Sequence, residues 1–181
     1  MANPRAPLDI VQVGHPVLRQ QARPLELDEL ASPRIQKLIA DMQETMRAAP
    51  GVGLAAPQIG EPLQLAVIED EQGGVPFHVV VNPIVTVRTE DLVRAFEGCL
   101  SFAGFRMIVP RARKVRLEAF DEHGQRYTKV ATDWYARIVQ HECDHLAGTV
   151  CIDRAETRTL CNNDNYTQYW QGKPVEDARD I

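Results

Sequence analysis

The chain has 181 residues, of which 44% are hydrophobic and 25% charged, a composition typical of one globular domain and not of a disordered protein. Its net charge of −5, from 20 basic and 25 acidic residues, argues against a general nucleic-acid coat, and 6% aromatic residues are too few to favour a base-stacking platform. No stretch approaches the roughly 20 apolar residues of a transmembrane helix, and the start of the chain lacks the apolar segment of a secretory signal. We therefore expect a cytosolic or organellar protein, without a DNA or membrane partner, whose four cysteines are free or metal-bound.

The first part of the chain contains one clear predicted helix. Residues 8–14 favour a short strand, and residues 15–19 favour a helical turn. Ser32 is then a typical N-cap, and Pro33 suits the first helical position. The helix is expected to end near residues 49–51, because a proline at position 50 disfavours helical backbone in the residue before it. Its core-facing residues follow the helical period and are Ile35, Leu38, Ile39, Met42 and Met46.

The middle of the chain, from about residue 63 to residue 131, has strand character. Strict alternation over 114–120 predicts a half-buried strand, and the turn residues 121–124 predict a hairpin that returns over 125–130. Upstream of this hairpin, the expected order is a strand at 63–68, a turn at Gly73–Gly74, a strand at 77–81 and a break at Asn82–Pro83.

The last part of the chain begins with a second predicted helix over 133–147, followed by Gly148 in the position of a C-terminal glycine. Past Arg158, the polar run at 162–165 is a poor helix former, so we expect an extended tail from about residue 159. No internal repeat or flexible linker interrupts residues 1–181, which are expected to form a single domain. The predicted fold class is α+β, with antiparallel strands packed around the second helix.

The strongest chemical signal lies on that helix, in Gln140-His-Glu-Cys-Asp-His145, which contains the pattern H-E-x-x-H. Helical residues four apart differ by about 40° in azimuth and about 6 Å in height, so His141 and His145 can reach one metal ion. Glu142 lies roughly 60° to the side of His145, where it is a poor ligand but well placed to contact a metal-bound water. The pattern predicts a catalytic metal site; a structural metal or a chance match are the alternatives.

The helix also places its histidines on a buried face. Ile138, His141 and His145 each fall within about 40° of Trp134 on the helical wheel, which predicts a single core-facing stripe. Two histidines are costly to bury without partners, and a metal ion is a natural partner for both.

The third ligand is not fixed by the spacing. No histidine follows His145, and the downstream candidates are Cys151 and Asp153. The upstream candidate is Cys99, in Glu97-Gly-Cys-Leu-Ser101, whose position suits a ligand at the end of a strand. A single cysteine is also often a small buried hydrophobic residue, so all three remain open at this point.

A glycine-rich segment, Gly51-Val-Gly-Leu-Ala-Ala-Pro-Gln-Ile-Gly60, gives a further signal. Its small residues let another backbone come close, and the amide of Gln58 is able to donate a hydrogen bond to a developing oxyanion. The segment lacks the Lys and Ser/Thr of a phosphate loop, so nucleotide binding is disfavoured, and a simple glycine-rich turn is the alternative.

Together, Gly51-Val-Gly-Leu-Ala-Ala-Pro-Gln58, Glu97-Gly-Cys-Leu-Ser101 and Gln140-His-Glu-Cys-Asp-His145 resemble the three signature motifs of the type I peptide deformylases, in the same order and with matching spacing. The resemblance extends from about residue 10 to about residue 160. The proline before Gln58 and the segments 102–106 and 134–138 are most similar to the mitochondrial and plant-organellar branch of that family.

The resemblance implies a set of metal ligands and a reaction. Cys99, His141 and His145 would bind one ion, typically Fe²⁺ in this family, with Zn²⁺, Ni²⁺ or Co²⁺ able to replace it. The substrate would be a nascent peptide that begins with N-formylmethionine, and the products would be formate and a free amine. Metal-bound hydroxide would be the nucleophile and Glu142 the general acid and base, while the Gln58 amide and the backbone N–H of Leu100 would stabilise the oxyanion.

The same resemblance suggests how the peptide would be held. The backbone of Val52, Gly53 and Gly98 would pair with the extended substrate as an added strand. Trp134 and Ile138 would form a wall of the methionine pocket; ordinary core packing is their alternative. Arg106 would orient either Glu97 or the substrate carbonyls. The remaining supporting pair is expected to be Asp144 with Arg111, and the basic run at 106–116 is expected to be a solvated strand face, with docking near ribosomal RNA as the minor alternative.

Two features depart from the family pattern, and two other functions stay open. Cys143 lies about 160° from both histidines on the wheel, so we expect it not to compete for the metal. The asparagine-rich tail is unlike the C-terminal helix of many bacterial members, which weakens the case for transient ribosome contact through such a helix. The alternatives are a zinc endopeptidase, which needs a downstream third ligand, and a non-catalytic metal-stabilised binding module, which needs a fourth protein ligand.

Overall fold

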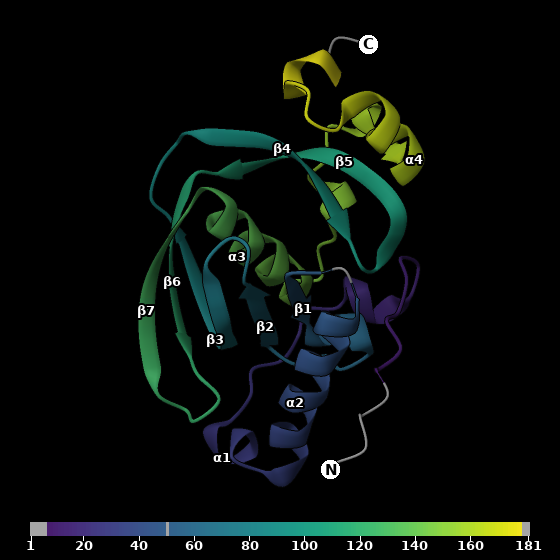
Figure 1. Cartoon of the computed structure of the whole chain (residues 1–181). Coiled ribbons are helices and arrows are strands. Elements are labelled where there is room, and N and C mark those ends of the chain that lie inside the picture. The colour runs from purple at the N-terminus through teal and green to yellow at the C-terminus, as the bar shows by residue number, and fades with distance from the viewer. Residues whose placement is uncertain (1–6, 50, 179–181) are drawn as a thin grey trace.

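The computed structural model describes residues 7–49 and 51–178, which form two antiparallel sheets with one helix between them. The first sheet has the order β1-β2-β3-β6-β7 and consists of β1 (Gly53–Ala55), β2 (Leu65–Asp70), β3 (Val75–Val87), β6 (Lys114–Phe120) and β7 (Arg126–Thr132). The second sheet has the order β4-β5-β8 and consists of β4 (Leu92–Cys99), β5 (Phe102–Ala112) and β8 (Cys161–Asn162). Helix α3 (Asp133–Leu146) contacts strands of both sheets (Figure 1). The expected α+β class, with antiparallel strands around this helix, is confirmed.

The five-stranded sheet is covered on both faces. On β2, Ala66 and Ile68 belong to a core that includes the buried face of α3, whereas Leu65 and Val67 pack into a second core with helix α2 (Pro33–Ala48). Successive strand residues point to opposite faces, so a strand buried on both sides must be apolar throughout. This explains why the sequence at 63–68 shows no polar alternation.

Helix α2 forms as its sequence predicts. The Ser32 hydroxyl accepts a hydrogen bond from the Ile35 N–H at 3.4 Å, and Pro33 is the first helical residue. The helix ends at Ala48, in agreement with the expected end, although residue 50 lies outside the described part of the chain. Four of the five predicted core residues are buried and the fifth, Leu38, is half-buried. A short helix, α1 (Leu27–Leu30), precedes α2.

The strand expected at residues 8–14 is wrong, whereas the helical turn after it is confirmed as Pro16–Arg19. The segment forms no strand and turns at residues 13–14, and its backbone forms hydrogen bonds with two different elements. The Val11 N–H donates to the carbonyl of Gln58 at 2.9 Å, and the Val13 N–H donates to the carbonyl of Ser101 at 2.7 Å. Because these partners belong to separate elements, no regular ladder forms.

The expected break at Asn82–Pro83 is also wrong, because β3 continues through it to Val87. The pairing register of β3 with β6 shifts between Val81 and Ile84, so Asn82 and Pro83 form a bulge. Asn82 adopts a φ of 49°. Its side-chain oxygen accepts a hydrogen bond from the Leu25 N–H at 2.9 Å, and its side-chain nitrogen donates one to the Leu25 carbonyl at 2.8 Å. The left-handed backbone is thus held by a distant segment.

The hairpin and the second helix follow the prediction closely. Strand β6 has the expected bounds, and β7 begins and ends within two residues of the expected return strand. Helix α3 ends one residue before the expected end, and Gly148 follows its cap with φ 72°. A Cβ at Gly148 would lie 2.8 Å from the carbonyl oxygen of Arg19, so this position requires glycine for space as well as for conformation. None of the described helices is both long and apolar enough to cross a membrane.

The tail expected to be extended is instead folded. After β8 come α4 (Asn163–Asn165), a π-helical turn at Tyr166–Trp170 and a 3₁₀ turn at Val175–Ala178, which lie over the second sheet (Figure 1). The side chain of Asn162 accepts a hydrogen bond from the Asn165 N–H at 2.8 Å, so the polar run begins a helical turn as a cap. Tyr166 then packs against Phe96 of β4, with 5.0 Å between the ring centroids. Capping and this long-range contact outweigh the low helix propensity of the run.

Candidate active site

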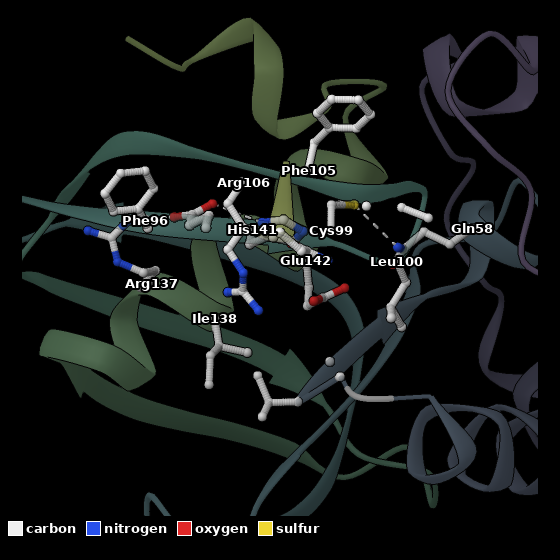
Figure 2. Close-up of a pocket in the computed structure, with 18 of the residues that line it drawn as sticks. Gln58, Phe96, Cys99, Leu100, Phe105, Arg106, Arg137, Ile138, His141 and Glu142 are labelled. Atoms are coloured by element: carbon white, nitrogen blue, oxygen red, sulfur yellow. Dashed lines mark hydrogen bonds and ion pairs between the residues drawn. The ribbon is translucent and has the colours of Figure 1, made fainter. Parts of the chain in front are cut away.

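The structure brings together three residues that can hold a metal ion. Cys99 lies at the end of β4, and His141 and His145 lie one turn apart on α3. One donor atom from each lies within 4.8 Å of the other two, and the Sγ of Cys99 is 3.3 Å from the Nε2 of His145. Figure 2 shows Cys99 and His141 at the same cavity. Of the three candidates for the third ligand, Cys99 is therefore the one that joins the histidines.

The two downstream candidates do not join this group. Asp153 accepts a hydrogen bond from the Val150 N–H at 2.9 Å and pairs with Arg19 at the surface. Cys151 is buried in the cluster against which Cys99 packs, but it is not part of the three-residue group. Within the described residues, the group offers neither the downstream ligand of the endopeptidase alternative nor the fourth ligand of a closed structural site.

Buried charges hold His141 in place. Glu97, which is 4% exposed, lies with Oε2 at 3.0 Å from the Nδ1 of His141. Arg111 donates two hydrogen bonds to the same carboxylate, at 2.9 and 3.0 Å, and Arg137 donates a third. Although burial opposes it, hydrogen bonds from His141 and Arg111 keep the pKa of Glu97 well below its ordinary value. An ionised Glu97 accepts the Nδ1 proton, which leaves the Nε2 lone pair of His141 available for a metal.

The other two donors also suit a divalent cation. Burial, and then the neighbouring His141, lower the pKa of His145 well below its ordinary value, so this imidazole is neutral. Interaction with the Cys151 thiol, together with burial, raises the pKa of Cys99. A bound cation reverses that preference, since a coordinating thiol is deprotonated. One thiolate and two imidazoles form a donor set that Zn²⁺ or Fe²⁺ accepts.

Glu142 has the environment of a general base. It is 4% exposed, and no described residue makes a hydrogen bond to its Oε2. Burial raises its pKa to about 7, an effect that His141 partly opposes, so the carboxylate can take and return a proton near neutral pH. Gly53 leaves room for this group, because a Cβ there would lie 2.3 Å from the Oε1 of Glu142.

Gln58 directs its amide nitrogen toward the metal-binding group. Its Oε1 accepts a hydrogen bond from the Ala55 N–H at 2.8 Å, and this fixes which end of the amide faces the site. The Nε2 then lies 3.3 Å from the Oγ of Ser101 and 3.7 Å from the Sγ of Cys99. A buried N–H donor beside the metal ligands can stabilise a developing negative charge.

A cavity of about 370 Å³ joins these groups (Figure 2). Its walls include Gln58, Cys99, Leu100, His141 and Glu142. They also include all six residues predicted to contact substrate, namely Val52, Gly53, Gly98, Arg106, Trp134 and Ile138. Trp134 is less buried than the helical wheel suggested, at 47% exposed, and its indole N–H donates to Asp70 at 2.9 Å. Ile138 is buried.

The expectation that Arg106 orients Glu97 is wrong. In the β4–β5 register Arg106 pairs with Gly98, whereas Glu97 pairs with Met107, so Arg106 and Glu97 lie on opposite faces of the sheet. The Arg106 guanidinium instead lies 4.9 Å from the ring centre of Tyr166. Its predicted contact with substrate carbonyls stays a prediction.

The expected pair between Asp144 and Arg111 is confirmed. The same pair shows that the basic run is not solvated throughout, because Arg111 is only 3% exposed. Arg113 further along the run is exposed and pairs with Asp91 and Asp133. Cys143 packs in the core beside the first sheet, away from the metal group, as expected.

Sequence reasoning missed Arg137. The helical wheel places it on a flank of α3, but it is 3% exposed and donates to Glu97 and to the carbonyls of Val109 at 2.7 Å and Val93 at 2.6 Å. The available signal was an arginine one position before the buried Ile138. Phe96, Phe105 and Asn163 also line the cavity unpredicted, and Asn163 comes from the tail.

Comparisons with known proteins identify the family of this chain. A family model described as polypeptide deformylase matches residues 7–160. Peptide deformylase 3 of Streptomyces avermitilis is 45% identical over 95% of this chain and 82% of its own length, and peptide deformylase 1A of Arabidopsis thaliana, described as chloroplastic/mitochondrial, is 43% identical over 87% and 64%. The crystal structure of a peptide deformylase from Synechococcus elongatus in complex with actinonin has a TM-score of 0.76 and 36% identity, covering 97% of this chain and 91% of that one. The chain belongs to the polypeptide deformylase family.

Proposed function

We propose that this protein removes the formyl group from the N-terminal formylmethionine of nascent polypeptides and releases formate. The observation that carries the proposal is the group of Cys99, His141 and His145 beside Glu142, whose Oε2 has no hydrogen-bond partner among the described residues. Cys99, His141 and Glu142 line one cavity. This set contains a metal-binding group and a base for a water molecule, which amide hydrolysis requires.

We infer that Cys99, His141 and His145 hold one divalent ion, and that this ion is Fe²⁺ in the cell. The family resemblance supports iron, while the donor set also suits Zn²⁺, Ni²⁺ or Co²⁺ in a purified sample. When bound, such an ion lowers the pKa of a coordinated water and polarises a carbonyl oxygen. Glu97 keeps His141 in the tautomer that this binding needs.

Glu142 moves the proton in the proposed reaction. As a carboxylate it takes a proton from the attacking water, and as a carboxylic acid it gives that proton to the nitrogen of methionine as the C–N bond to the formyl carbon breaks. A pKa of about 7 suits both roles. The products are formate and a free amine.

Two donors are assigned to the oxyanion of the tetrahedral intermediate. One is the side-chain amide of Gln58, which Ala55 holds with its nitrogen toward the site. The other is the backbone N–H of Leu100, the residue that follows Cys99. Both residues line the cavity, and donors fixed before the reaction cost no reorganisation as charge develops.

The peptide is expected to bind as an extended strand. The backbone of Val52, Gly53 and Gly98 would pair with it, and Trp134 and Ile138 would contact the methionine side chain. Arg106, at the same cavity, is assigned to the substrate carbonyls. The formyl carbon carries only hydrogen, so a narrow site can exclude larger acyl groups.

The proposed substrate determines where the protein acts. Formylated nascent chains place it in the cytoplasm of a bacterium or in the matrix or stroma of an organelle, and transient contact with the ribosome would supply them. We also propose that residues 1–181 form a single catalytic domain.

Formate release from formyl-Met-Ala-Ser tests the function. The wild-type chain loaded with Ni²⁺ should release one formate for each peptide that it deformylates. Glu142→Ala should lose at least about 100-fold in kcat/KM, the effect typical of removing a general acid–base group, while it retains one metal per chain. Full activity in that variant, or no release by the metal-loaded wild type, would refute the proposal.

A further inference from the structure

Two of the four cysteines pack in one hydrophobic cluster beside the metal-binding group. Cys151 is 2% exposed and packs with Met107 and Val109, and the side chain of Cys99 packs against the same cluster. The side chains of Cys99 and Cys151 meet in this one cluster, where each thiol is the leading influence on the pKa of the other, and both are free. This contact joins the end of β4 to the start of the 3₁₀ turn Cys151–Asp153, 52 residues later in the sequence.

The two sulfur atoms differ in their access to solvent. Cys99 lines the open cavity, so a small oxidant can reach this residue, whereas Cys151 is buried and does not line the cavity. The remaining cysteines are placed elsewhere. Cys143 packs in the core beside the five-stranded sheet, and the thiol of Cys161 faces the carbonyl of Arg106 at 3.7 Å.

We propose that Cys99 and Cys151 form a reversible disulfide when a peroxide oxidises the metal-free site. In the first step, the Cys99 sulfur attacks hydrogen peroxide, the O–O bond breaks, and Cys99 sulfenic acid and water form. In the second, the Cys151 sulfur attacks the sulfenic sulfur, the S–O bond breaks, and a disulfide and a second water form. In total two thiols are oxidised and one peroxide is reduced to two waters.

The consequence is a site in which metal binding and oxidation exclude each other. A sulfur held in a disulfide cannot serve as a thiolate ligand, so oxidation removes one of three ligands. The same bond protects Cys99 from the sulfinic and sulfonic acids, which reducing agents do not reverse. An added dithiol breaks the disulfide by exchange and restores the ligand. The inference rests on the proposed function only in that Cys99 is a metal ligand.

The test maps the disulfide by mass spectrometry. The full chain is loaded with Zn²⁺, which does not react with peroxide, and is then treated with hydrogen peroxide in the presence of a chelator. Free thiols are blocked with N-ethylmaleimide, and the protein is digested with trypsin without reduction. The expected product links the peptide 95–106, which contains Cys99, to the peptide 138–154, and fragmentation places the bond at Cys151 and not at Cys143. Excess Zn²⁺ should slow its formation by about tenfold.

Variants separate the roles of the two thiols. Cys151→Ser should bind Zn²⁺ as the wild type does before oxidation, but after peroxide and then dithiothreitol it should regain about tenfold less Zn²⁺ binding, with Cys99 present as sulfinic or sulfonic acid. Cys161→Ser is the matched control and should behave as the wild type throughout. If Cys151→Ser fails to fold, mapping the wild-type chain decides the question alone.

The proposal is overturned if wild-type Cys99 is found as sulfinic or sulfonic acid without the linked peptides, or if Cys151→Ser recovers as fully as the wild type. Neither readout uses deformylation. A chain that forms the disulfide and releases Zn²⁺ but does not act on formyl-Met-Ala-Ser would refute the proposed function and support this inference.

Discussion

Replacing Glu97 by glutamine tests the buried network behind the metal-binding group. The Glu97 carboxylate accepts two hydrogen bonds from Arg111, one from Arg137 and one from His141, and the two arginine side chains are 3% and 4% exposed. The neutral amide of Glu97→Gln leaves Arg137 without a buried counter-charge and leaves Arg111 with that of Asp144 alone. Breaking a buried ion pair by removing one partner typically costs about 3–5 kcal/mol, and losing the partner of a histidine ligand typically weakens metal binding about 10–100-fold.

Urea denaturation of the metal-free chain and Zn²⁺ competition with a chromogenic chelator measure the two effects. The loss of stability in Glu97→Gln should persist at pH 5. The pKa of Glu97 lies well below its ordinary value, so the wild type keeps the stabilisation by the ionised carboxylate until the pH falls through that lowered value. The matched control is Glu118→Gln, whose pairs with Arg116 and Arg126 lie at the surface and should contribute less than about 1 kcal/mol. A Glu97→Gln chain with wild-type stability and Zn²⁺ affinity would refute the reasoning.

Three further substitutions have defined outcomes. Burial raises the pKa of Glu142 to about 7, so the folded metal-free chain binds more protons than the unfolded chain between about pH 4.5 and pH 7, and its stability falls as the pH rises. Glu142→Gln should therefore be about 2–4 kcal/mol more stable than the wild type at pH 8 and nearly equal at pH 4 in chemical denaturation; equal stabilities at pH 8 would contradict this. In Gly53→Ala, a methyl group 2.3 Å from Oε1 displaces Glu142 and should lower kcat/KM by about 100-fold with metal content unchanged; a wild-type rate would contradict the assigned place of the base. Asn82→Ala removes two hydrogen bonds to Leu25 and strains a backbone at φ 49°, so it should cost about 2–4 kcal/mol in urea denaturation; a loss below about 0.5 kcal/mol would show that the bulge forms without them.

The parts of the fold that the sequence predicts well are those specified by neighbouring residues. Helix α2 has a serine cap and a proline at its first position, β6 alternates strictly, and α3 ends before a glycine with positive φ. The residues that give such a signal lie within one or two helical turns or within one hairpin. A short segment of the sequence therefore contains the whole signal.

The parts that the sequence does not predict depend on distant partners. Strand β3 continues through Asn82 because Leu25, 57 residues away, bonds to its side chain. The tail folds because Tyr166 packs against Phe96, 70 residues earlier. Propensity alone favours a break in the first case and an extended chain in the second.

The candidate site divides in the same way. His141, Glu142 and His145 are predictable because one helix fixes their spacing. The residues alone leave Cys99, Cys151 and Asp153 open as candidates for the third ligand, and the tertiary structure separates them. The network around Glu97 depends on the register of β4 against β5, which no local pattern specifies.

The most direct test of the central claim is X-ray absorption at the metal edge of the full chain loaded with one Zn²⁺. We predict one sulfur and two imidazole nitrogens in the first coordination shell, with at least one further light-atom ligand from solvent. Cys99→Ser should remove the sulfur signal, and Cys151→Ser should leave it unchanged. A spectrum with two sulfur ligands, or a sulfur signal that survives in Cys99→Ser, would contradict the assigned metal centre and the reaction built on it.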